Sequence, residues 1–315
     1  MKQKRSYPLF YINQTRRKKK KMTQDSMQFA AAESGLRFYQ AYDQSLSLWQ
    51  IESEAFYVST RFGKTHIMAS GPKDAPSLIL LHGGLFSSAM WYPNIAAWSS
   101  QFRTYAVDII GDKNKSIPTA ALDTRADCAE WLKDVFDSLG LQKAHLAGLS
   151  LGGSHIVNFL LQAPERVSRA VVMSPAEAFI SFHPDVYKYA AGLTGGSGAE
   201  AYIKWITDSR YDLHPLLRRQ IVTGVEWQDE KRTLKPAENG FPYVFTDREL
   251  KSIAVPILLM FGEREVMYHQ QMALERAAVL VPGIQAEIVK NAGHLLSLEQ
   301  PEYVNQRVLS FLSGE

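Results

Sequence analysis

The stretch Gly148-Leu149-Ser150-Leu151-Gly152 decides the fold. It joins an apolar run at residues 144–149 to a helical pattern at 156–161. A serine between two glycines at a strand-to-helix turn is held in a strained backbone conformation with its hydroxyl exposed, and small neighbours let the strand and helix approach closely. The motif alone is weak evidence for a catalytic serine, because a glycine-rich turn without a catalytic role is the alternative interpretation of the same residues. Its position between a strand and a helix favours Ser150 as a nucleophile.

Short apolar runs alternate with helical patterns from residue 77 onward. These runs lack the polar alternation of a half-exposed sheet, as expected for parallel strands that are covered on both faces. We therefore predict an α/β fold with a mostly parallel central sheet and helices on both faces. The predicted strands are 77–81, 105–110, 144–149, 170–173, 256–261 and 287–289, preceded by antiparallel strands at 56–61 and 66–69, and the clearest helices are 124–139 and 300–312.

This alternation lapses between residues 176 and 250, where helical pieces rich in aromatic residues replace it. An insertion after one strand and before the next suits a helical lid over the sheet edge where ligands bind. We predict a basic, disordered tail at 1–25, the core at 26–175 and 251–315, and the lid at 176–250.

The loop Leu81-His82-Gly83-Gly84-Leu85 directly follows a predicted strand. It can offer a backbone N–H to a substrate carbonyl oxygen, with Gly84 favoured over Leu85 as the donor. The N–H of Leu151, at the start of the next helix, would be the second donor of an oxyanion hole. His82 is expected to orient this loop rather than to act as a base.

A base and an acid are expected on the last two loops of the sheet. Asn291-Ala292-Gly293-His294 places an imidazole between the last strand and the last helix, with His155 as the rival base. Phe261-Gly262-Glu263-Arg264-Glu265 ends the preceding strand, and Glu265 fits best as the carboxylate that orients the imidazole. Glu263 and Glu177 remain alternatives for this acid.

The order Ser150, Glu265, His294 along the chain is the order that α/β-hydrolases use. From about residue 56 to its end the chain resembles the α/β-hydrolase superfamily, although many relatives carry aspartate where Glu265 stands. The segments GLSLGG, FPYVFTD and NAGHLLSLEQPEYVNQRV resemble small Bacillus carboxylesterases, including the type that hydrolyses naproxen esters. This resemblance implies a carboxylesterase with a Ser, Glu and His triad, no metal or other cofactor, and a lid over an apolar acyl pocket.

Aromatic and sulfur-containing side chains near these motifs are candidates for that pocket, although most residues of this kind are core. The pocket candidates are Phe86, Met90, Phe182 and Trp205. Ser150 argues against haloalkane dehalogenases and epoxide hydrolases, which resemble the chain but carry aspartate at the elbow. Carbon–carbon bond hydrolases, thioesterases and perhydrolases use the same triad, and a ligand sensor on this fold is a further alternative.

Charge is distributed unevenly along the 315 residues. Residues 1–22 hold nine Lys or Arg and no acid, which leaves 26 basic against 32 acidic residues elsewhere. A single basic run lacks the basic and aromatic stripe of a nucleic-acid-binding face, so we expect a small-molecule ester as the partner and no nucleic acid. The chain has no convincing secretory signal and no apolar run long enough to insert in a membrane. Its one cysteine, Cys128, fits a buried position and a cytoplasmic protein.

Overall fold

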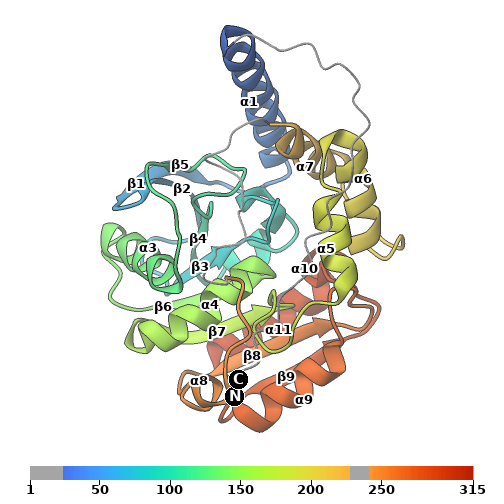
Figure 1. Ribbon diagram of the computed structural model, residues 1–315. Coiled ribbons are helices and arrows are strands. Elements are labelled where there is room, and N and C mark those ends of the chain that lie inside the picture. Colours follow the sequence, from blue (N-terminus) through green and yellow to red (C-terminus); the bar gives the residue numbers. More distant parts are fainter. Residues whose placement is uncertain (1–23, 228–240, 315) are drawn as a thin grey trace, which may run out of the picture.

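The computed structural model describes residues 24–227 and 241–314 (Figure 1). A nine-stranded sheet forms its centre, with the order β1-β2-β4-β3-β6-β7-β8-β9 and with β5 paired to β2. The strands are β1 (Glu54–Thr60), β2 (Gly63–Ser70), β3 (Ser77–Leu81), β4 (Arg103–Val107), β5 (Ile117–Pro118), β6 (Ala144–Leu149), β7 (Val167–Met173), β8 (Ile257–Gly262) and β9 (Gln285–Val289). Strands β3, β4, β6, β7, β8 and β9 pair in parallel, whereas β1, β2 and β5 add antiparallel pairs.

The predicted parallel sheet is confirmed, and its centre is covered on both faces. Every residue of β8 is buried, which requires packing layers on either side of that strand. Strand β4 differs most from the prediction of 105–110, because it ends at Val107 and Asp108 begins a buried loop. Ile109 and Ile110 are buried in that loop. The apolar side chains of Ile109 and Ile110 therefore indicated burial correctly, but these residues are not part of a strand.

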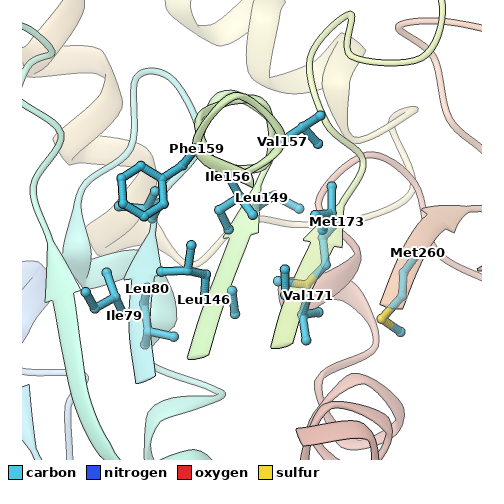
Figure 2. Close-up of a cluster of buried hydrophobic side chains, with 14 of the residues drawn as sticks. Ile79, Leu80, Leu146, Leu149, Ile156, Val157, Phe159, Val171, Met173 and Met260 are labelled. Atoms are coloured by element: carbon cyan, nitrogen blue, oxygen red, sulfur yellow. The ribbon is translucent and has the colours of Figure 1, made fainter. Parts of the chain in front are cut away.

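Helices connect and cover these strands. They are η1 (Ser88–Trp91), α2 (Ile95–Ser99), α3 (Arg125–Ser138), α4 (Leu151–Gln162), η2 (Pro164–Arg166), α9 (Gln270–Leu280), α10 (Leu296–Glu299) and α11 (Pro301–Ser313). Helix α4 is buried over its first ten residues. Figure 2 shows Ile156, Val157 and Phe159 of α4 beside the apolar side chains of the central strands. This packing fixes the helix that begins directly after Ser150.

The predicted insertion contains helices α5 (Pro184–Ala191), α6 (Gly195–Ile206), α7 (Pro215–Glu226) and α8 (Asp247–Lys251). Figure 1 shows α5, α6 and α7 together on one side of the sheet. We refer to α5, α6 and α7 as the lid helices. Residues 228–240 of the predicted lid lie outside the described residues.

A long helix that the sequence did not predict, α1 (Gln24–Leu46), packs against α7 (Figure 1). Phe38 stacks on Trp227 with ring centroids 5.0 Å apart, and Tyr42 completes this small apolar cluster. The buried amide of Gln220 in α7 accepts a hydrogen bond from Ser45 and donates one to Ser87, both at 2.6 Å. Helix α1 therefore ties α7 to the core.

The predicted tail of residues 1–25 lies outside the described residues except for its last two, which begin α1. Cys128 lies in α3, where burial raises the pKa of its thiol to about 12. This confirms the prediction of a buried core cysteine. Within the described ranges, no helix combines the length and apolar character needed to cross a membrane.

Candidate active site

Ser150 occupies a sharp turn between β6 and α4. Its φ of +53° and ψ of −116° lie outside the regions that L-residues normally adopt. A Cβ atom at Gly152 would lie 2.0 Å from the Leu81 carbonyl oxygen, and one at Gly148 would lie 2.7 Å from Gly152. The two glycines are therefore required by space, as the motif predicts. Ser150 is 9% exposed.

The imidazole of His294 faces the carboxylate of Glu265. The Nδ1 atom of His294 lies 2.9 Å from Oε1 and 2.8 Å from Oε2 of Glu265, and neither side chain is exposed. Glu265 Oε1 also accepts the backbone N–H groups of Val266 and Met267, each at 2.9 Å. The carboxylate is thus held in place by the backbone that follows β8.

A second carboxylate, which the sequence analysis did not identify, holds the loop around His294. Glu299 accepts the N–H of Gly293 at 2.7 Å and that of Leu295 at 3.1 Å, so it binds the backbone on both sides of the histidine. Burial raises the pKa of Glu299, while these two hydrogen bonds and the nearby Arg264 favour its charged form. Glu299 acts on the backbone and not on the imidazole ring.

The other ring nitrogen of His294, Nε2, is buried and has no hydrogen-bond partner among the described residues. Nδ1 is engaged by Glu265, so Nε2 is the atom left to exchange protons with a substrate or a nucleophile. The hydrogen bond between Nε2 and Ser150 that a triad requires is not formed in this structure. Catalytic hydrogen bonds are often long in structures without substrate and tighten when substrate binds.

The loop after β3 lies beside Ser150. A Cβ atom at Gly83 would lie 3.6 Å from the Cβ of Ser150. The Gly83 N–H donates to the Met90 sulfur at 3.4 Å, and the Phe86 N–H donates to the Gly83 carbonyl at 3.1 Å. The Leu85 N–H donates to Asp112 at 3.0 Å.

These contacts bear on the oxyanion hole expected from Gly84, Leu85 and Leu151. The Asp112 hydrogen bond occupies the Leu85 N–H, which argues against Leu85 as a donor to substrate. In the part of the chain that the structure describes, the N–H groups of Gly84 and Leu151 have no hydrogen-bond acceptor. Leu151 is the first residue of α4, where helical N–H groups lack partners within the helix.

His82 and His155 both have environments that suit structural roles. His82 Nδ1 lies 2.8 Å from the Gly83 carbonyl, and its Nε2 accepts the Ile109 N–H at 2.9 Å, so both ring nitrogens bind backbone. His155 packs between Trp131 and Phe241, and burial lowers its pKa to about 3. Neither ring is paired with a carboxylate as His294 is.

The two alternative acids contact other groups. Glu263 accepts the Asn291 N–H at 3.0 Å. Glu177 accepts the Tyr187 hydroxyl at 3.2 Å and the Phe182 N–H at 3.4 Å. Neither hydrogen-bonds to His294, so the geometry favours Glu265.

Comparison with known proteins agrees with this geometry. A model of the alpha/beta hydrolase family matches residues 78–307. The chain belongs to the alpha/beta hydrolase family. It is 88% identical to carboxylesterase YbfK of Bacillus subtilis over 93% of this chain and 99% of the relative. The predicted α/β-hydrolase fold is therefore confirmed.

Two solved structures of Bacillus subtilis alpha/beta hydrolases superimpose on the chain. Carboxylesterase CesB (YbfK) matches with a TM-score of 0.89, 88% identity and coverage of 90% of this chain and 99% of the other. Naproxen esterase (carboxylesterase NP) matches with a TM-score of 0.86, 59% identity and coverage of 89% and 98%. The resemblance to small Bacillus carboxylesterases is confirmed.

The four pocket candidates of this alpha/beta hydrolase divide into two pairs. Phe86 and Met90 are buried, and Met90 supports the Gly83 loop through its sulfur. Phe182 and Trp205 are half-buried; Phe182 stacks on Tyr268 with centroids 6.4 Å apart and Trp205 stacks on Tyr189 at 4.5 Å. Their contact with an acyl group stays a prediction.

Proposed function

We propose that Ser150, His294 and Glu265 are the nucleophile, general base and orienting acid of a serine carboxylesterase. The predicted reaction class, hydrolysis of carboxylic esters, is confirmed by the similarity to curated carboxylesterases. The observation that carries the residue assignment is the buried Glu265–His294 pair, whose Nε2 is unpartnered among the described residues. Ser150 at the strained elbow supplies the hydroxyl that such a base needs.

Glu265 sets the protonation state of the imidazole. A carboxylate facing Nδ1 favours the tautomer with the proton on Nδ1 and leaves Nε2 free to accept one. Its negative charge then stabilises the imidazolium that forms when Ser150 loses its proton. The two backbone N–H groups on Glu265 Oε1 keep that carboxylate from rotating away.

In the first half of the reaction, Ser150 Oγ bonds to the ester carbonyl carbon as its proton passes to His294 Nε2. The carbonyl oxygen becomes an oxyanion, which the N–H groups of Gly84 and Leu151 stabilise. The intermediate collapses by breaking the bond to the alkoxy group, which leaves as the alcohol with the proton from the imidazolium. Ser150 is then acylated.

In the second half, water attacks the acyl carbon and gives a proton to His294 Nε2. The new oxyanion occupies the same N–H groups. Its collapse releases the carboxylic acid and returns the proton to Ser150 Oγ. The cycle needs no group beyond the protein and water.

We further propose that the acyl group lies in an apolar pocket between the Gly83 loop and the lid helices. Phe86 lies next to the loop beside Ser150, and Phe182 and Trp205 come from the lid. Half-buried aromatic side chains suit an apolar ligand because they gain burial when it binds. The partner is thus a small-molecule ester, and the single cysteine keeps the cytoplasm as the proposed compartment.

An acyl-length series of p-nitrophenyl esters tests this function. We expect multiple turnovers on several esters, with kcat/KM varying with acyl length as the apolar pocket fills. A ligand sensor would release at most one equivalent of p-nitrophenol. Turnover of thioesters or of carbon–carbon substrates with higher kcat/KM than of all the esters would contradict the proposed substrate class.

A further inference from the structure

The carboxylate of Asp112 contacts the loop that carries the proposed oxyanion donor. Asp112 follows β4, which is the parallel neighbour of β3, and Leu81 pairs with Val107 at the carboxyl ends of these strands. Asp112 is 1% exposed. Its Oδ2 accepts the Leu85 N–H at 3.0 Å, and its Oδ1 accepts the N–H of Lys113 at 2.7 Å.

The hydrogen bond to Leu85 selects one form of a tight turn. Residues Gly83 to Phe86 form a β-turn, closed by the Phe86 N–H and the Gly83 carbonyl, with Leu85 as the third residue. Leu85 has a φ of +67°, a conformation that favours glycine in this turn position. In the common turn without a positive φ, the peptide between Gly84 and Leu85 faces the opposite way. The Leu85 N–H would then point away from Asp112.

We infer that Asp112 is a positioning residue for the oxyanion hole, because its carboxylate holds the Gly84–Leu85 peptide and thereby the turn that presents the Gly84 N–H. The Gly84 N–H is the one in this turn that has no acceptor among the described residues, whereas Gly83, Leu85 and Phe86 are all bonded. The hydrogen bonds of Asp112 are to the backbone of Leu85 and Lys113 and not to Ser150. Asp112 acts through Leu85.

A carboxylate near an oxyanion is unfavourable unless it serves another purpose. Burial raises the pKa of Asp112, although His82, the backbone N–H groups of Leu85 and Lys113 and the Lys113 charge act in the opposite direction. A neutral amide would avoid that repulsion and still offer its oxygen to the Leu85 N–H, and the bond that it loses is the one to the Lys113 N–H, which lies outside the turn. The positioning role therefore predicts that asparagine replaces Asp112 far better than alanine does.

The inference rests on the proposed function and is tested with a trifluoromethyl ketone, which forms an oxyanion when its carbonyl adds to Ser150. For Asp112→Ala we expect the inhibition constant to rise and kcat to fall by about tenfold or more, with KM within about threefold. For Asp112→Asn, the inhibition constant, kcat and KM should each stay within about threefold of the wild-type value.

Leu85→Pro tests whether this turn serves the oxyanion site, and it leaves the buried Asp112 side chain in place. Proline lacks the N–H and excludes the positive φ, so this variant loses both the bond to Asp112 and this form of the turn, and its affinity for the ketone should fall by about tenfold or more. Ser116→Ala is the control. Its hydroxyl donates to the Asp108 carbonyl at 2.7 Å and accepts the His66 N–H at 2.9 Å, and neither bond involves the turn of residues 83–86, so affinity should not change.

Wild-type affinity for the ketone in Asp112→Ala, with or without a lower melting temperature, would overturn the role of Asp112. Wild-type protein that neither binds the ketone nor hydrolyses esters would instead overturn the proposed function. The two failures are therefore distinguishable in one set of measurements.

Discussion

Both carboxylate oxygens of Glu265 lie within 2.9 Å of Nδ1 of His294, and both side chains are fully buried. Water therefore cannot compete for this contact, and the low local dielectric strengthens it. The pair comes from two loops that follow the adjacent strands β8 and β9. A Cβ atom at Gly262 would lie 2.0 Å from the Gly293 carbonyl oxygen, so glycine is required for these loops to meet.

Replacing Glu265 tests its assignment as the acid. Glu265→Gln keeps the volume, removes the charge and favours the wrong tautomer, so kcat should fall by about 10³- to 10⁴-fold. Glu265→Asp shortens the side chain and should cost about tenfold or more, because a misplacement of about 1 Å is expensive in a positioned site. Glu177→Gln is the matched control and should lose less than about tenfold. Steady-state kinetics measures these effects, with circular dichroism to confirm folding. Normal turnover by Glu265→Gln would show that Glu265 is not the acid of the triad.

Glu299 is expected to position His294 through the backbone. Glu299→Gln replaces one acceptor oxygen by an NH₂ group that cannot accept an N–H, so one of the bonds to Gly293 and Leu295 is lost. We expect kcat to fall about tenfold with little change in KM. Glu302→Gln, at an exposed position in α11, is the control. Equal kcat values for the two variants would show that Glu299 has no such role.

The sequence predicted the parts of the site that have local signals. The elbow, the Gly83 loop and the His294 loop each combine a motif with the end of a strand. Glu299 and Asp112 carry no comparable signal, because their partners become apparent only when the loops are placed in three dimensions. Helix α1 was missed for a similar reason: Phe38 packs on Trp227, directly after α7, and Tyr42 packs on His66 of β2, and these partners are distant in the sequence. The lid boundaries stay a prediction.

The basic segment 1–22 precedes α1 and lies outside the described residues. We expect its deletion to leave kcat/KM for a neutral short-chain ester within about twofold and the melting temperature almost unchanged. Phe38→Ala is the contrasting variant, since it removes a buried ring from the contact with Trp227 and should cost about 3 kcal/mol or more of stability. A large loss of activity after the deletion would mean that residues 1–22 contribute to the folded protein.

Asp108 predicts a pH-dependent contribution to stability. Burial alone would raise the pKa of its carboxyl, but hydrogen bonding and charge from His66, together with the Ser88 N–H, hold it well below its ordinary value. A lowered pKa in the folded state stabilises the protein above the unfolded-state value, near 3.9, and this stabilisation is lost as the pH falls toward the folded-state value.

Asp108→Asn should therefore destabilise the protein by about 3 kcal/mol or more at pH 7, and the difference from the wild type should shrink below about pH 4. Urea unfolding of both proteins at pH 7, 5 and 3 measures this difference in the free energy of unfolding. A difference that is the same at all three pH values would show that the charge of Asp108 does not contribute.

Covalent labelling at Ser150 tests the central claim most directly. A serine-directed phosphonate ester should add once to the wild-type protein, and mass spectrometry of the intact chain and its peptides should place the adduct on Ser150. Ser150→Ala should remain folded, take up no label and lose about 10⁴-fold or more in kcat. An adduct on any other residue, or undiminished labelling of Ser150→Ala, would contradict the assignment of Ser150 as the nucleophile.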